Sequence, residues 1–182
     1  VESFDLRQLL WRTLVMLGHK ERAYELLDWL IADQRLAPWR EWPEISWRDR
    51  RAPRFVGDIP HGWIASSFVR AVRRMIAYER TRDRALVLAA GVPEAWVREA
   101  PGVRVHGLPT HHGLLDLTMC EDGDDRVKVS IGGSLRVPEG GIVVESPYAR
   151  PIRALVVDGS RSAPADSARV IVRKATAEIV LE

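Results

Sequence analysis

A change in the spacing of apolar residues near residues 80–85 constrains the fold more than any other feature of this sequence. Before it, apolar side chains recur at every third or fourth position, which is the spacing of a helix that buries one face. After it, they alternate with polar side chains, as in strands with one face toward solvent. Helices followed by strands indicate separate layers or domains. We therefore predict an α+β chain, with a helical segment over residues 1–83 and an antiparallel β-sandwich over residues 84–182.

Three helical stripes precede the change, at residues 6–17, 23–31 and 64–79. The link between the first two is so short that these helices should form an antiparallel hairpin. The first stripe, which we expect to be a buried face, comprises Leu6, Leu9, Leu10, Thr13, Leu14 and Leu17. We expect no strand before residue 60.

The alternating part of the chain predicts a series of short strands. Asp122-Gly123 and the segment 138–141 are turn signals between them. The predicted strands cover residues 86–88, 103–105, 115–119, 127–131, 142–144, 152–157, 170–172 and 178–181, with one helical turn at residues 93–97.

Charge and composition exclude several classes of function. The 182 residues carry 27 basic and 25 acidic side chains that are interleaved along the chain, whereas a nucleic-acid-binding protein needs a clustered basic surface. No apolar run approaches the roughly 18 residues of a membrane span. Cys120 is the single cysteine, so no intrachain disulfide is expected and the redox compartment stays open. His111-His112 has no cysteine or acid at ligand spacing, and we expect neither a metal nor a cofactor.

The segment over residues 38–62 is a long connection without a sustained period. Connections beyond about 12–15 residues are uncommon, and they tend to be functional or disordered. It holds Trp39, Trp42 and Trp47, and Trp63 lies just past its end, so four of the seven tryptophans fall within 25 residues. A disordered linker lacks such aromatic content. We therefore predict a functional loop.

Carboxylates accompany these tryptophans. Indole rings stack on the flat apolar faces of sugars, and carboxylates such as Glu41 and Glu44 accept hydrogen bonds from hydroxyls or act in acid–base catalysis. In the alternative interpretation, the tryptophans anchor the loop in the core and the two glutamates are solvated. Residue types alone leave both open.

A second candidate element precedes the third helix. Gly57 and Gly62 permit unusual backbone angles around it, and it places Asp58 and His61 at the helix entrance. Free amide donors at such an entrance suit anionic or hydroxyl-rich ligands. Alternatively, Asp58 or His61 is only a local cap or turn former.

Several of these segments resemble the end of the toroid in bacterial six-hairpin glycosidase-like proteins. The resemblance covers most of residues 1–150, and its most specific part is the Asp-x-Pro-His-x-Trp element. The segments that carry it are Trp47-Arg48-Asp49, Gly57-Asp58-Ile59-Pro60-His61-Gly62-Trp63, Phe68-Val69-Arg70, Ala77-Tyr78-Glu79 and Leu86-Val87-Leu88-Ala89-Ala90-Gly91-Val92-Pro93.

Such proteins are similar to glucoamylases in architecture, and some carry discoidin-like (coagulation factor 5/8 type) modules. The resemblance implies the last helices of an (α/α)6 toroid, followed by a sandwich, in a glycoside hydrolase acting on an oligo- or polysaccharide. Its sites lie in loops at the funnel mouth. Glu44 is then the catalytic carboxylate by location, and Trp42, Trp47, Asp58, His61 and Trp63 bind substrate.

The resemblance also implies partners for this chain. The second catalytic carboxylate would precede Val1, so the chain alone would be inert and would pair with a missing amino-terminal part. The absence of an initiator Met agrees with a cut from a longer polypeptide. A second copy could cover apolar helix faces instead. The competing interpretations are a non-catalytic carbohydrate-binding module and a purely structural tail.

Overall fold

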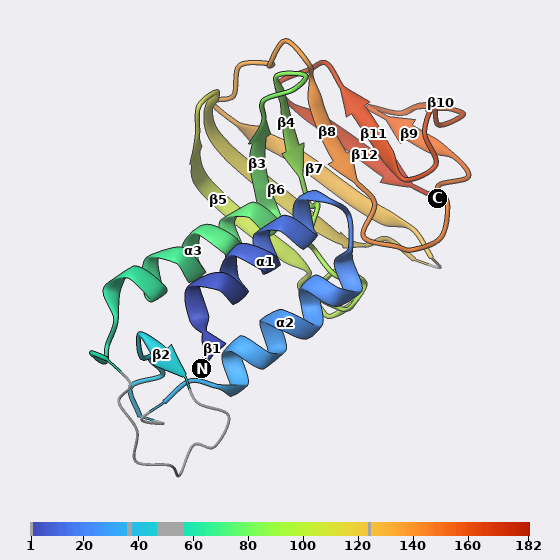
Figure 1. Ribbon diagram of the computed structural model, residues 1–182. Coiled ribbons are helices and arrows are strands. Elements are labelled where there is room, and N and C mark those ends of the chain that lie inside the picture. The colour runs from blue at the N-terminus through green and yellow to red at the C-terminus, as the bar shows by residue number, and fades with distance from the viewer. Residues whose placement is uncertain (1, 36–37, 47–56, 124) are drawn as a thin grey trace. The chain divides into compact units, whose positions relative to one another are not determined.

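The computed structural model describes residues 2–35, 38–46, 57–123 and 125–182, so Trp47 lies outside the described residues. The chain divides into two compact units, Val1–Met75 and Ile76–Glu182 (Figure 1). The apolar spacing predicts this boundary near residue 83, whereas in the structure it lies between Met75 and Ile76. Ala77–Arg80 does not extend the third helix, because it pairs as an antiparallel strand with Ala85–Leu88.

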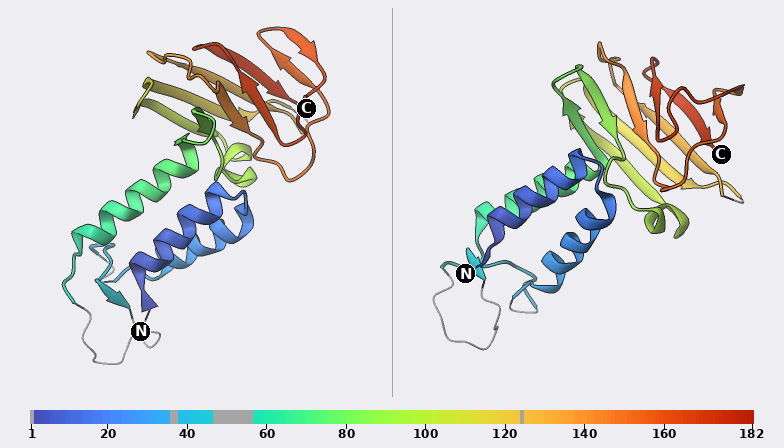
Figure 2. Two further views of the ribbon diagram at one scale, coloured as in Figure 1. Left: turned by 45° about the horizontal axis from the view of Figure 1, so that its top comes forward. Right: turned by 45° about the vertical axis from the view of Figure 1, so that its right-hand side comes forward.

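The first unit is mainly helical. The hairpin prediction is confirmed, since the first two helices lie side by side in opposite directions (Figures 1 and 2). Strands do occur before residue 60, contrary to expectation, because the start of the chain pairs with the loop backbone over two residues on each side. The elements are β1 (Glu2–Ser3), α1 (Phe4–Met16), α2 (Lys20–Ala32), β2 (Ile45–Ser46) and α3 (Gly62–Ile76).

Aromatic side chains from different elements form the core of this unit. The ring of Phe68 on α3 lies 5.5 Å from that of Trp11 on α1 and 4.5 Å from that of Trp42 in the loop, measured between centroids. The indole of Trp42 also donates a 2.7 Å hydrogen bond from Nε1 to the carbonyl of Leu30 on α2. The loop is therefore fastened to the three-helix core through one buried residue.

The face of α1 that packs inside is not the predicted leucine stripe. Leu10 and Leu17 are 52% and 67% exposed, whereas Gln8 and Trp11 are fully buried. Gln8 donates a hydrogen bond from Nε2 to the carbonyl of Ile64 on α3, and Trp11 meets an aromatic ring of the same helix. The face of α1 that carries Gln8 and Trp11 therefore packs against α3. Within the described part of the chain, Leu10 and Leu17 stay exposed to solvent.

Leu10, one of the exposed leucines of α1, lines a groove between α1 and α2, here called the α1–α2 groove. The guanidinium of Arg7 lies 3.8 Å from the ring centroid of Trp29 in this groove, at cation–π distance. The groove is lined by Arg7, Leu10, Leu14, Arg22, Glu25, Leu26 and Trp29.

The second unit consists of two sheets (Figure 2). Their strand orders are β10-β9-β12-β7-β6-β5 and β11-β8-β4-β3, and the pairs are antiparallel except for β4 with β8, which is parallel. The elements are β3 (Ala77–Arg80), β4 (Ala85–Leu88), α4 (Glu94–Arg98), β5 (Val103–Thr110), β6 (Gly113–Glu121), β7 (Val127–Gly133), β8 (Ile142–Glu145), β9 (Leu155–Val157), β10 (Ser160–Ser162), β11 (Arg169–Val172) and β12 (Ala177–Leu181).

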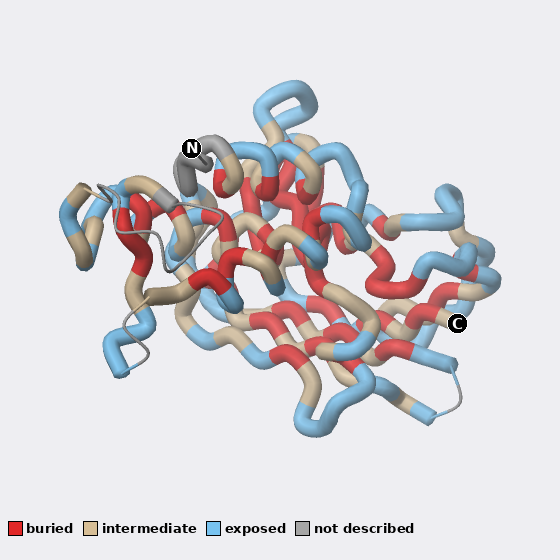
Figure 3. The backbone as a smooth tube through the Cα atoms, turned by 60° about the horizontal axis from the view of Figure 1, so that its bottom comes forward, coloured by how far each residue is buried: buried red, intermediate tan, exposed pale blue. Residues whose placement is uncertain are grey.

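One apolar core joins the two sheets. Leu117 of β6 belongs to the same buried cluster as Leu88 of β4 and Val144 of β8. Buried residues alternate with more exposed ones along β6 and β7, as the period of two predicts. Figure 3 shows the buried residues of the chain in red. The α+β prediction is thus confirmed. The two sheets share one core, although the β4–β8 pair is parallel and not antiparallel as predicted. Among the described helices, none combines the length and the apolar character needed to cross a membrane.

We expect the open leucine face to drive self-association of this chain. The double variant Leu10→Glu with Leu17→Glu should reduce it, because charge replaces apolar surface that gains from burial. Sedimentation velocity over a range of concentrations measures the effect. Leu114→Glu, a change at a 48% exposed leucine of β6, is the matched control and should leave association as in the wild type. A wild-type chain that stays monomeric throughout contradicts the prediction.

Candidate functional site

Backbone pairing brings together two loop segments that flank residues outside the described part. The amide of Glu44 donates to the carbonyl of Asp58 at 3.2 Å, and the amide of His61 donates to the carbonyl of Trp42, also at 3.2 Å. Because Trp42 is fastened to α2 through its indole, this pairing fixes the second segment to the core as well. The carbonyl of His61 then accepts the first helical hydrogen bond of α3, from Ala65 at 3.1 Å.

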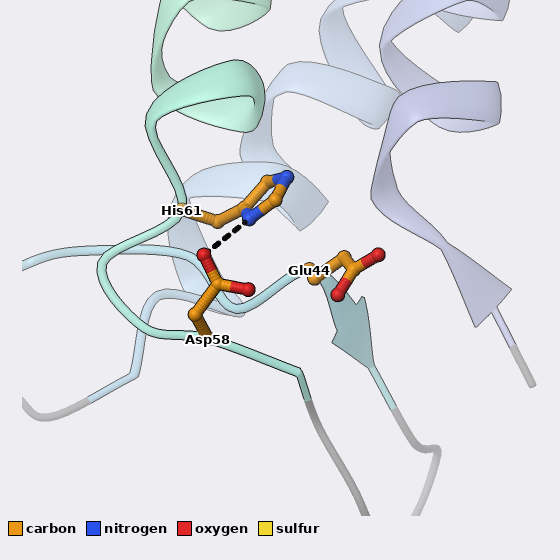
Figure 4. Close-up of side chains that lie close together, drawn as sticks. All are labelled: Glu44, Asp58 and His61. Atoms are coloured by element: carbon orange, nitrogen blue, oxygen red, sulfur yellow. Dashed lines mark hydrogen bonds and ion pairs between the residues drawn. The ribbon is translucent and has the colours of Figure 1, made fainter.

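The side chains of Glu44, Asp58 and His61 converge at this point (Figure 4). One oxygen or nitrogen of each lies within 4.8 Å of those of the other two. Nδ1 of His61 is 3.1 Å from Oδ2 of Asp58. Both carboxylates are exposed, whereas His61 is partly buried. Of the six residues predicted to catalyse or to bind substrate, the structure thus brings three together.

Gly57 is needed for the close approach of Glu44. A Cβ atom at this position would lie 2.2 Å from Oε2 and 2.6 Å from Cβ of Glu44. Its φ of +68° is also one that residues with a side chain rarely adopt. The close approach and the positive φ both favour glycine, and the missing side chain lets the segment at residue 57 lie against Glu44.

Asp58 is held in its ionised form. The hydrogen bond from His61 lowers the pKa of this carboxyl below its ordinary value, and a bond from backbone N–H adds to the effect. Because ionised Asp58 only accepts, Nδ1 of His61 must carry the hydrogen between them. In the neutral imidazole, Nε2 is then left as an acceptor for a ligand.

Glu44 differs from its neighbours in having no committed partner. The described residues offer its carboxylate no hydrogen bond and no ion pair, although its backbone is fixed. An exposed carboxylate that is positioned but unpaired is available to a ligand or to proton transfer.

The same cluster has the composition of a divalent-cation site. Carboxylate oxygens and an imidazole nitrogen are ligands that zinc accepts, at bond lengths of about 2.0–2.2 Å. Within the described part of the chain, Glu44, Asp58 and His61 are the one group of such side chains close enough together. Exposed acidic groups are also common without a metal. The expectation that the chain holds no metal therefore stays a prediction.

Of the three tryptophans predicted to bind substrate, the two that the structure describes differ in their exposure to solvent. Trp42 is 5% exposed and packs on Phe68, so it is a core anchor and not a platform for sugar, as the alternative interpretation of the loop allows. Trp63 is 67% exposed on the first turn of α3. Trp47 lies outside the described residues, so its substrate-binding role stays a prediction.

Sequence reasoning missed the polar residues that follow Trp63 along α3. Ser66, Ser67 and Arg70 line a shallow depression together with Gly62 and Trp63. Their spacing of three, four and seven residues from Trp63 puts all of them on one face of a helix. This helical spacing is the feature of the sequence that could have identified the three residues as neighbours of Trp63.

Protein-family models, curated proteins and solved structures were compared with this chain, and none matched.

We expect Asp58 to titrate below the ordinary aspartate pKa of 3.8. His61→Ala should raise its pKa, because the largest cause of the lowering is the imidazole hydrogen bond. The stability that ionised Asp58 contributes is present above its unfolded pKa and is lost as pH falls through the lower folded value. Carboxyl-carbon NMR during an acid titration measures this pKa. His19→Ala, at an exposed histidine before α2, is the control, and an equal response to both variants would refute the pairing.

Proposed function

We propose that this chain is part of a carbohydrate-active enzyme of the glycoside hydrolase type, to which it contributes Glu44 as general acid or base. The observation that carries the proposal is the state of this carboxylate. It is exposed, free of partners among the described residues, and held within 4.8 Å of the Asp58–His61 pair. The motif at residues 57–63 and its resemblance to six-hairpin glycosidases support the same choice.

The Asp58–His61 pair suits the binding of sugar hydroxyls. With Nδ1 of His61 donating to Asp58, Nε2 accepts a hydrogen bond from a hydroxyl. Oδ1 of Asp58, the oxygen that is not bonded to His61, accepts a hydrogen bond from a second hydroxyl. The pair thereby orients a sugar beside Glu44, and orientation is a large part of what an enzyme contributes to such a reaction.

Asp58 is not the second catalytic carboxyl in this proposal. Inverting glycosidases separate their carboxyls by about 6.5–9.5 Å to admit a water molecule, and retaining ones by about 5–5.5 Å. The decisive observation is that the Asp58 carboxylate is already bonded to His61, 3.1 Å away, so we assign it to orienting the imidazole. We assign the second carboxyl to a part of the enzyme outside this chain, and this assignment leaves the chain inert by itself.

The same proposal assigns an occupant to the α1–α2 groove. In an (α/α)6 toroid each helical hairpin packs against neighbouring hairpins, so helices of the same enzyme would cover the open leucines. The exposure of Leu10 and Leu17 agrees with a face that awaits such partners. A second copy of the chain would cover the same face in their absence.

A non-catalytic carbohydrate-binding module is the second candidate. The exposed indole of Trp63 favours it, because a solvent-facing indole can stack on a sugar without any chemistry. Such a module would bind sugar but would not need the titratable group of Glu44. The two candidates therefore differ in what happens when that group is removed.

We expect Glu44→Gln in the intact enzyme to lower turnover by roughly 10²–10⁴-fold, the usual contribution of a general acid or base. Glutamine keeps the size and hydrogen-bonding shape of the side chain, so KM should change little. Steady-state kinetics on a panel of oligosaccharides and aryl glycosides measures both quantities.

Glu41→Gln is the matched control, since it removes the same charge three residues earlier in the loop. Its turnover should stay near that of the wild type. Unchanged turnover in Glu44→Gln would remove Glu44 from the mechanism. If the variant still bound the oligosaccharide as the wild type does, the binding-module candidate would take its place.

A further inference from the structure

The depression on α3 presents an aromatic ring and a cation on the same helix face. Its described lining consists of Gly62, Trp63, Ser66, Ser67 and Arg70, around a volume of about 390 Å³. The depression begins at Gly62, which directly follows His61 in the chain.

Arg70 differs from the other two arginines of α3 in its contacts. Arg74 donates a 3.0 Å hydrogen bond to the sulfur of Met16, and Arg73 also has a partner. Arg70 is exposed, and no hydrogen bond or ion pair engages it in the described part of the chain. Its five donors are therefore available to an anion.

Trp63 is similarly available. Its side chain is 67% exposed, and the hydrogen bond at this residue, from the hydroxyl of Ser66, goes to its backbone carbonyl. An indole face takes up the apolar face of a sugar ring. The residue thus offers a platform at one end of the depression.

The separation of the two groups suits more than one sugar unit. Seven residues of helix place the Cα atoms of Trp63 and Arg70 about 10 Å apart along the axis. A ring stacked on Trp63 would leave Arg70 beside the next unit of a chain. A guanidinium binds carboxylate or sulfate in a planar, two-bond geometry, whereas it has no such match in a neutral hydroxyl.

We propose that this depression binds an acidic glycan, with one sugar ring on Trp63 and the anionic group of a neighbouring unit on Arg70. The inference rests on the proposed carbohydrate function and adds the charge class of the substrate. The anionic group is a uronate carboxylate or a sulfate ester. Both can present two oxygens to the guanidinium.

Isothermal titration of the 182-residue chain tests the inference with three probes: an oligogalacturonide, a sulfated oligosaccharide and a neutral malto-oligosaccharide. At least one anionic probe should bind more tightly than the neutral one. Trp63→Ala and Arg70→Gln should each weaken that binding roughly tenfold or more, as the loss of a charge-assisted hydrogen bond predicts for Arg70. Both side chains are exposed, so circular dichroism should show intact folds.

Controls separate the inference from its premise. Trp63→Phe should restore part of the affinity, and Arg22→Gln, which removes the same charge on α2, should change nothing. Equal binding of neutral and anionic probes, unaffected by Arg70→Gln, overturns the inference and leaves the carbohydrate function standing. Binding that depends on Arg70 but not on Trp63 also overturns the inference, because it would show attraction of an anion without stacking of a sugar ring. If no probe binds, both the inference and the carbohydrate function lose their support.

Discussion

The burial of Trp42 is the interaction on which the candidate site depends. Its ring packs on Phe68 and its indole nitrogen bonds to the carbonyl of Leu30, so a loop residue becomes part of the helical core. Its own carbonyl then receives the amide of His61. Glu44 follows two residues later and bonds through its amide to Asp58. One anchored aromatic side chain thus determines where three polar groups meet.

The site combines fixed backbone with uncommitted side chains. Glu44 and Arg70 have no partners among the described residues, and Trp63 turns its ring to solvent, although each lies on a segment held by backbone hydrogen bonds. Their availability on one stretch of loop and helix is the physical basis for a binding function. Asp58 and His61, by contrast, satisfy each other and so keep a defined orientation.

Much of the second unit was predictable, because a period of two fixes which side chains of a strand face the core. The helical unit was harder. Leu10 and Leu17 have the spacing of a buried stripe, yet Gln8 and Trp11 occupy the interior, since one bonds to Ile64 and the other packs on α3. Helix spacing cannot tell which of two apolar faces a partner will choose. The proximity of Glu44 and Asp58 was predicted because aromatic and acidic residues are concentrated in the loop and because the loop resembles a known motif. The hydrogen bonds that produce this proximity join backbone groups, so no residue type in the sequence indicates them.

Native-state hydrogen exchange at two amides tests the central claim most directly. If the loop segments pair as described, the amides of Glu44 and His61 are both hydrogen-bonded across the loop and held by one buried anchor. Both should then exchange far more slowly than unstructured amides, with similar opening free energies, because they are released by the same local unfolding. Exchange of either amide at the unprotected rate would contradict the pairing, and with it the convergence of Glu44, Asp58 and His61.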